Sequence, residues 1–405
     1  MNVGWKCIIM LSIGIDTHQK MHYVEVQNNE EKVMWRGQID NNKEGFNSLL
    51  LKVKTIERSN NDNVIGIYIN PTGTYHMPLQ YFLENNNYGV NYVDARITNY
   101  VRKIENLGKE KSDKVDAHLL ALTPWKYKES DKKPHVRNDL SELTRLLYIV
   151  KRNTTRITNT LLSDLACVFP EFITFFPDIT TKTALIMLGK YTLPEDIIKA
   201  GIDEIFDIMR KTSRGHYSKN DSERFLKLAV DSIGIPDTGV YSIRIKENIK
   251  RLNSEIASIN NIENKINEIS NNNNDIRNIN DIMGIGKVNA VTIVSEIGNI
   301  QQFNSSRNLQ SYGGKAPLME GSGGESHAVG ISRIRNLYLS NAVYECSISL
   351  VNHKNREFLD IFNREIKKGK KTTQAYIIVG NRLLKHVYSI LKNKKPYKQR
   401  LAVDS

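Results

Sequence analysis

The sequence predicts an α/β domain followed by two largely helical regions, a fold class of α/β plus α. Apolar runs of strand length alternate with helical segments up to about residue 125, and the apolar spacing is helical from about 135 to 270. The polar tract SNNNND then separates the helical region from a basic, mostly helical end. We therefore expect three parts: residues 1–125, a helical linker with a coiled coil at 126–275, and residues 276–405.

The first domain has the pattern of a mixed sheet. Strands are predicted at residues 7–15, in HYVEVQNN and KVMWRGQI, and then in VIGIYIN and YGVNYVDA. Helices are predicted in EGFNSLLLKVKTI and PLQYFLENN. Strand pairs followed by alternating helices and strands indicate a mixed sheet with helices packed on it.

The middle region contains an isoleucine-rich seam. Between residues 245 and 269, apolar side chains recur at steps of three and four, which is the spacing of a coiled coil. Such a seam needs a partner helix, so we expect it to serve assembly into a dimer or tetramer.

The charge balance indicates a polyanionic partner. The net charge is +13, and residues 353–400 hold 14 lysines and arginines against three acidic residues. Charge alone does not separate nucleic acid from an acidic membrane surface. Phosphate contacts are expected from the run KKGKK, which contributes Lys367, Lys368, Lys370 and Lys371.

The three cysteines and the apolar N-terminal run indicate a cytoplasmic protein. The cysteines are widely separated, so neither a disulfide framework nor a zinc site is predicted, and a reducing compartment fits. The run CIIMLSIGI is too short to span a bilayer, and we interpret it as a buried strand.

Three aspartates form a candidate metal site. In KSDKVDAHLLA, Asp113 and Asp116 lie three residues apart and share one face if this stretch is helical. A solvated helix start would also favour acids there. Asp16, however, closes the buried strand IGID, where a carboxylate is well placed to bind a divalent ion. One strand-end aspartate with a helical pair is the arrangement by which an RNase H-like sheet holds Mg²⁺.

These stretches resemble the transposases of the insertion-sequence 110 family, which is related to the pilin-gene invertases. IGIDTHQK is similar to the family's first-aspartate strand, KSDKVDAHLLA to its Asp-x-x-Asp-Ala helix, and NPTGTYHMPL to the signature after its glutamate. The resemblance extends over nearly the whole chain. It implies a RuvC-like, RNase H-like first domain with a catalytic metal set of Asp16, Asn70, Asp113 and Asp116, holding Mg²⁺ or Mn²⁺.

Asn70 departs from the family, because it stands where the family has its glutamate. An amide oxygen still ligates Mg²⁺, but it is neutral, so the site has one negative charge fewer. Two interpretations stay open: a variant that works with three aspartates, and a site that has lost activity.

The C-terminal region contains the remaining candidate residues. The MGIGKVNA turn directs backbone N–H groups and Lys287 at a phosphate, or is simply a tight turn between helices. In GGKAPLMEGSGG, the resemblance identifies Ser322 as a nucleophile that attacks a DNA phosphate and forms a 5′-phosphoserine link. Lys315 flanks this loop and is a further candidate for phosphate contact.

The resemblance also implies partners. Members of the family use a structured non-coding guide RNA, a bridge RNA, to pair with donor and target DNA, and assemble as tetramers. The leading hypothesis is therefore a metal-dependent serine recombinase of the transposase type. Alternatives are a Piv-like site-specific DNA invertase, a catalytically silent nucleic-acid-binding derivative, and a junction nuclease that uses the acids and water alone.

Overall fold

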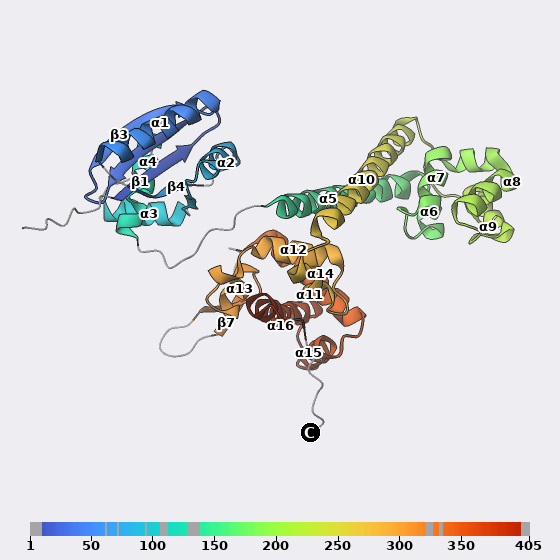
Figure 1. Ribbon diagram of the computed structural model, residues 1–405. Helices are drawn as coiled ribbons and strands as arrows, with labels where there is room; N and C mark the ends of the chain where they lie inside the picture. Colours follow the sequence, from blue (N-terminus) through green and yellow to red (C-terminus); the bar gives the residue numbers. More distant parts are fainter. Residues whose placement is uncertain are drawn as a thin grey trace, which may run out of the picture. The chain divides into compact units, whose positions relative to one another are not determined.

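A computed structural model gives the structure of residues 10–60, 63–70, 73–93, 95–105, 112–127, 138–320, 327–331 and 335–397. The chain divides into two compact units (Figure 1). Unit 1 comprises residues 1–136 with 299–304, and unit 2 comprises residues 137–298 with 305–405. The predicted domain boundaries at residues 125 and 275 stay predictions.

Unit 1 is built on a five-stranded mixed sheet. Its strands are β1 (Met10–Thr17), β2 (Met21–Asn28), β3 (Val33–Asp40), β4 (Asn63–Ile69) and β5 (Val90–Tyr92), in the order β3-β2-β1-β4-β5. The first three strands are antiparallel, whereas β4 and β5 run parallel to β1. This arrangement confirms the predicted α/β class and its RNase H-like form.

Helices cover both faces of this sheet. One face packs on α1 (Lys43–Asn60) and α2 (Met77–Asn85), and its core includes Ile13 and Ile15 of β1 and Leu49 of α1. The other face packs on α4 (Asp113–Lys126), which lies beside α3 (Ala95–Ile104). Because successive side chains in a strand alternate between faces, Ser12, Gly14 and Asp16 lie on the α4 face.

Gly14 lets α4 lie close to the sheet. A Cβ atom at this position would lie 2.1 Å from the carbonyl oxygen of Ala117 and 2.3 Å from the backbone nitrogen of Ala121. The backbone of β1 therefore touches the backbone of α4, which only glycine permits. This contact fixes the height of α4 above the strand that ends at Asp16.

A polar cluster lies between β2 and α4. Glu25 is completely buried and accepts hydrogen bonds from Arg36 and Gln27, each at 2.5 Å, and lies 2.6 Å from Nδ1 of His118. These bonds keep the pKa of the Glu25 carboxyl below its ordinary value although burial acts to raise it. The buried charge is thus compensated by partners from β2, β3 and α4.

Unit 2 is mostly helical. Its first half contains α5 (Asp139–Val168), α6 (Pro170–Phe175), α7 (Lys182–Lys190), α8 (Pro194–Thr212), α9 (Lys219–Val230) and α10 (Val240–Ser270). The long helices α5 and α10 pack along one another, and five phenylalanines fill the core at their far end: Phe169, Phe172, Phe175, Phe176 and Phe225.

The predicted isoleucine seam finds a partner helix in its own chain. Ile245, Ile249 and Leu252 are buried in the core that α10 shares with α5, whereas Ile269 is 41% exposed. Ile266, near the end of the seam, is also completely buried, so intramolecular packing accounts for seam positions at both ends. A coiled coil between chains stays a prediction.

The second half of unit 2 is a helical bundle with one short hairpin. It contains α11 (Asn274–Asn280), α12 (Lys287–Ile297), α13 (Ser306–Tyr312), α14 (Leu337–Asn352), α15 (Arg356–Lys367) and α16 (Thr372–Asn393). The strands β6 (Pro317–Glu320) and β7 (His327–Ile331) pair between α13 and α14. The 3₁₀ turn Ile300–Gln302 belongs to unit 1. Within the described residues no helix is long and apolar enough to span a bilayer.

Candidate metal site and serine hairpin

Asp16 lies at the end of the central strand. It follows Ile15, which is buried on the α1 face, so its own carboxylate lies on the α4 face and is 16% exposed. In the neighbouring parallel strand, Ile69 pairs with Ile15, and Asn70 is the next residue of that chain segment. Asp16 and Asn70 are therefore corresponding positions near the ends of adjacent parallel strands, and their joint ligation of a metal stays a prediction.

Asp113 and Asp116 occupy the first turn of α4. The hydroxyl of Ser112 caps this helix by accepting a hydrogen bond from the Val115 N–H, at 3.4 Å. Carboxylates in the first turn also interact favourably with the helix dipole. The predicted helix is confirmed, and its start directs the two acids to the same edge of the sheet as Asp16.

His18 links two of the acids. Its Nε2 atom lies 3.2 Å from Oδ2 of Asp16 and 3.3 Å from Oδ1 of Asp113. One ligand atom from each of the three residues falls within 4.8 Å of the other two. The side chains come from β1, the turn after β1, and α4, so the fold brings together residues that are far apart in the chain.

The electrostatics of Asp16 reflect this crowding. Burial raises the pKa of the Asp16 carboxyl above its ordinary value, His18 lowers it, and the charges of Asp116 and Asp113 raise it again. Acids that raise one another's pKa gain stability from a bound cation, since the cation replaces repulsion by attraction. Carboxylate oxygens are also the donors that Mg²⁺ and Mn²⁺ prefer. The residues present therefore fit a divalent ion.

Asp116 has a different partner. Arg102 of α3 donates a hydrogen bond from Nη2 to Oδ1 of Asp116, and the Arg102 side chain is only 11% exposed. The carboxylate nevertheless contributes to the field at Asp16. Metal ligation by Asp116 and Asn70 stays a prediction, and Arg102 is a positive charge within the set that the sequence pattern did not include.

Ser322 lies outside the described residues, but the hairpin around it has a defined base. The backbone N–H of Asn336 donates to the carbonyl of Tyr312 at 2.8 Å, which joins the end of α13 to the start of α14. In the chain, Ser322 lies between these two joined residues. Its catalytic role stays a prediction.

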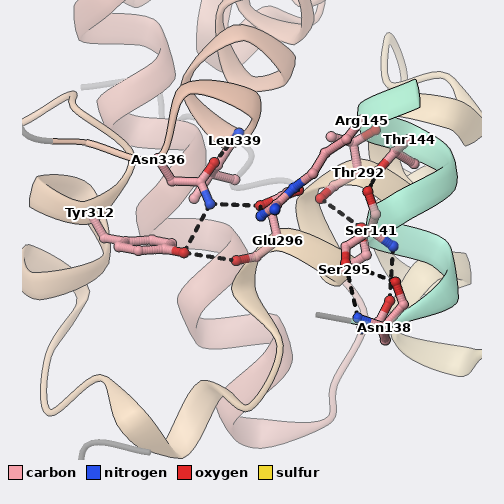
Figure 2. A network of polar contacts seen from close by, with 10 residues as sticks. All are labelled: Asn138, Ser141, Thr144, Arg145, Thr292, Ser295, Glu296, Tyr312, Asn336 and Leu339. Carbon is pink, nitrogen blue, oxygen red and sulfur yellow. Dashed lines mark hydrogen bonds and ion pairs between the residues drawn. The ribbon is translucent and has the colours of Figure 1, made fainter. Parts of the chain in front are cut away.

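A buried ion pair supports the base of the hairpin (Figure 2). Glu296 of α12 is completely buried, and Arg145 of α5 donates two hydrogen bonds to its carboxylate, at 2.6 and 2.8 Å. Asn336 donates to the same carboxylate at 2.6 Å and to the Tyr312 hydroxyl at 2.9 Å. The Tyr312 hydroxyl in turn donates to the Glu296 carbonyl at 3.3 Å. Glu296 thus contacts both ends of the hairpin, Asn336 through its carboxylate and Tyr312 through its backbone carbonyl.

The predicted phosphate-binding lysines differ in their surroundings. Lys287 donates to the Asn271 side chain at 2.7 Å, and Lys368 and Lys370 bind Glu365. Lys367 and Lys371 are exposed. Lys315 is only 4% exposed and lies over the Tyr344 ring at 5.4 Å, where burial and Arg335 lower its pKa to about 8. Their DNA contacts stay predictions.

Sequence reasoning missed three polar side chains. A loop histidine such as His18 is typical of a surface position, although its place two residues after Asp16 puts it on the same side of an extended chain. Arg102 and Glu296 lie far in sequence from the residues they bind, so no local pattern indicated them.

The comparisons with known families match both ends of the chain. A transposase family model of the DEDD type from the IS110 group matches residues 13–170. The model of the transposase IS116/IS110/IS902 family matches residues 276–362. The first match contains all three aspartates and Asn70, and the second contains Ser322.

Curated relatives are similar over a shorter stretch. A transposase for insertion sequence element IS1111A from Coxiella burnetii is 23% identical over 122 residues, which is 30% of this chain and 34% of the relative. A pilin gene-inverting protein from Moraxella bovis is 28% identical over 123 residues, or 30% of this chain and 38% of the relative. A pilin gene-inverting protein from Moraxella lacunata matches to the same extent. The chain thus spans little more than a third of the length of the curated relatives it matches.

Proposed function

Because the chain belongs to the IS110 family of transposases, related to the pilin gene-inverting proteins, we propose that it cuts and rejoins DNA as the recombinase of a mobile element. The observation that carries the proposal is the Asp16, His18 and Asp113 group at the end of the central strand. We propose that the two aspartates of this group, with Asn70 and Asp116, hold a divalent ion, preferably Mg²⁺.

The proposed nucleophile is Ser322. Its hydroxyl oxygen forms a bond to a DNA phosphorus while the bond from phosphorus to the 3′ oxygen breaks, which leaves a 5′-phosphoserine and a free 3′ hydroxyl. A 3′ hydroxyl of another DNA end then attacks the phosphoserine and releases the serine. The number of phosphodiester bonds is conserved, so rejoining needs no external energy source. A bound divalent ion would stabilise the charge that develops on the phosphate.

The residues of the chain have distinct parts in this proposal. Asp16 and Asp113, with Asn70 and Asp116, would hold the ion, and His18 would orient the carboxylates of Asp16 and Asp113 through its contacts at 3.2 and 3.3 Å. Glu296 and Arg145 support the base of the serine hairpin. Side chains that are already held in the reactive geometry lower the activation barrier of DNA cleavage, because they need not rearrange when the reaction begins.

The proposal includes partners and location. DNA is the substrate, and a structured guide RNA would select the sites by base pairing, as in other RNA-guided systems. A dimer or tetramer would bring several reactive serines to two DNA partners. The cysteine usage supports a cytoplasmic location.

A covalent adduct tests this function directly. Purified protein is incubated with labelled DNA spanning the junction of its own element, with Mg²⁺, with and without RNA transcribed from the flanking non-coding region. We expect a protein–DNA adduct on a denaturing gel that needs Mg²⁺ and is absent from Ser322→Ala. The matched control is Ser349→Ala on α14, which removes a hydroxyl elsewhere in unit 2 and should leave the adduct unchanged.

Two other functions make different predictions in the same assay. A Piv-like invertase, supported by the similarity to the inverting proteins, would form the adduct but act on inverted sites within one molecule. A silent binder, suggested by Asn70 and by the Arg102 contact to Asp116, would bind DNA without an adduct. If Asn70→Glu also forms none, the recombinase proposal is wrong. Cleavage that survives Ser322→Ala would instead indicate a nuclease that uses water.

A further inference from the structure

A polar groove runs along one side of α5 in unit 2. It is a hollow of about 840 Å³. Its lining comes from α5 and, on one edge, from Arg244 of α10. The lining residues are Ile149, Arg152, Asn153, Thr155, Arg156, Asn159, Thr160, Ser163 and Arg244. No member of this set is acidic, and we call it the α5 groove.

The groove has an unusual charge pattern for an exposed helix face. From Leu143 to Ser163 the helix contains four basic residues and no aspartate or glutamate, and two of the four, Arg152 and Arg156, line the groove. Solvated helices usually alternate opposite charges, because pairs three or four residues apart stabilise the helix. The groove face of α5 has no such pairs of opposite charge, so helix stability does not explain why its charged residues are all basic.

The acids near the groove already have partners. Asp164 is 2% exposed, and one of its oxygens accepts from Arg244 at 2.7 Å. Glu263 binds Lys151 at 2.9 Å, whereas Glu255 accepts from the neutral amide of Asn153, at 3.3 Å, and keeps its charge. Arg152 and Arg156 are exposed, with the Arg152 guanidinium 5.8 Å from the centre of the Tyr148 ring. The positive charge of the lining therefore comes from Arg152 and Arg156, since Arg244 is paired with Asp164.

The chemistry of the lining matches a phosphate backbone. Arginines bind phosphate oxygens with paired N–H groups, and asparagine, threonine and serine side chains donate further hydrogen bonds to them. From Ile149 to Ser163 the helix rises by roughly 21 Å. At about 3.4 Å of helix axis per base pair, this length equals roughly six base pairs measured along the axis of B-form DNA.

We propose that the α5 groove binds the backbone of double-stranded DNA that flanks the reacting bond. The choice of DNA rests on the proposed function, since DNA is the substrate that a recombinase must hold. The groove lies wholly within unit 2 and shares no residue with the candidate metal set. It adds a surface that binds DNA without taking part in the cutting itself.

The test measures DNA binding and its salt dependence without any chemistry. The variant Arg152→Glu/Arg156→Glu is compared with Arg210→Glu/Lys211→Glu, which changes two exposed cations of α8 by the same charge. Arg210 is a close match for Arg152, since it also lies over an aromatic ring four residues before it, at 5.9 Å from Phe206. Affinity for a labelled duplex of about three helical turns of DNA is measured in EDTA across a series of salt concentrations. An RNA duplex of equal length is measured in parallel.

We expect the groove variant to bind DNA at least tenfold more weakly near physiological salt. The plot of log affinity against log salt concentration should become less steep by about 1.8. Each lost phosphate contact on duplex DNA removes about 0.9, and the variant loses two such contacts. The control variant should keep the slope of the unchanged protein. A slope for DNA that is equal in the groove and control variants would overturn the proposal. So would a change confined to the RNA duplex, which would assign the groove to RNA.

Folding and function are controlled separately. If the charge reversal lowers the melting temperature, Arg152→Gln/Arg156→Gln removes the same two charges with less repulsion, and the slope is measured again. Because the assay contains no metal and no cleavage, its result is independent of adduct formation. If the protein forms no adduct but the groove variant still shows the lower salt slope, the groove proposal is supported and the recombinase proposal is not.

Discussion

The guanidinium of Arg145 holds the completely buried carboxylate of Glu296 through two hydrogen bonds, although the two residues are 151 positions apart in the chain. The pair joins α5 to α12 and, through Asn336, to the start of α14. A charge buried in this way is stable only while its partner remains.

Loss of Arg145 should therefore destabilise unit 2 strongly. Arg145→Ala should lower the free energy of unfolding by about 3 to 5 kcal/mol, because Glu296 would be left as a buried charge without its main partner. Urea unfolding followed by circular dichroism measures this change. Lys151→Ala on the same helix removes an exposed pair with Glu263 and should cost no more than about 1 kcal/mol. Equal losses of stability in the two variants would show that the buried pair contributes no more than the exposed pair.

Gly14 should accept no larger side chain. In Gly14→Ala the new methyl group would meet the backbone of α4 at 2.1 Å, so the helix must move away from β1. We expect a loss of about 1 to 3 kcal/mol in stability, typical of overpacking, together with weaker metal binding because Asp113 moves with the helix. Gly89→Ala is the control, since a Cβ atom there has no neighbour within 4 Å. Unchanged metal binding by Gly14→Ala would show that the contact between β1 and α4 does not position Asp113.

Metal binding should depend on the three clustered residues. Mn²⁺ in excess should raise the melting temperature, because an ion that binds only the folded state stabilises it. Asp16→Asn should abolish the increase, whereas Asp40→Asn, an exposed acid at the end of β3, should preserve it. Asn70→Glu adds a negative charge to the set and should enlarge the increase. An unchanged response in Asp16→Asn would place the ion elsewhere.

Lys315 should make stability depend on pH in the alkaline range. Its pKa is lowered from an ordinary value of 10.5 to about 8, chiefly by burial and further by Arg335. Below pH 8 the folded state bears the full cost of the buried charge. Between pH 8 and 10.5 the unfolded chain binds more protons than the folded chain, so stability rises with pH.

Replacing Lys315 by an uncharged residue of similar length should remove the rise in stability between pH 8 and 10.5. Lys315→Met should be more stable than the unchanged protein by about 1 to 3 kcal/mol at neutral pH, after the loss of the contact with Tyr344 is included. The advantage should shrink as the pH rises towards 10.5. Lys385→Met, at an exposed position of α16, should change neither stability nor slope. A constant difference across this pH range would show that Lys315 does not titrate there.

The sequence predicted what local patterns encode. The strand that carries Asp16 was predicted from its apolar run, and the helix that carries Asp113 and Asp116 from their spacing and the family resemblance, and both are confirmed. The isoleucine spacing at 245–269 correctly required a partner helix. It did not reveal that α5 of the same chain packs on the seam and buries Ile249 to 5% exposure, and assembly through the seam stays a prediction.

Long-range polar contacts could not be predicted in this way. Arg102 reaches Asp116 from a neighbouring helix, and Arg145 reaches Glu296 on a helix far along the chain. Such pairs depend on the relative placement of helices, which apolar periodicity leaves open. His18 was visible in the sequence, but its contact with Asp113 needed α4 to be in place.

The buried cluster around Glu25 also bears on how unit 1 reaches a single fold. In β2, Val24 and Val26 face the apolar core while Glu25 and Gln27 face α4. A slip of one residue between β2 and its neighbours would exchange the two faces and place a carboxylate among leucines and isoleucines. Misregistered sheets therefore carry a large energetic penalty. The Glu25 cluster therefore favours the native register of β2 over registers shifted by one residue. An entirely apolar strand would not distinguish these registers in this way.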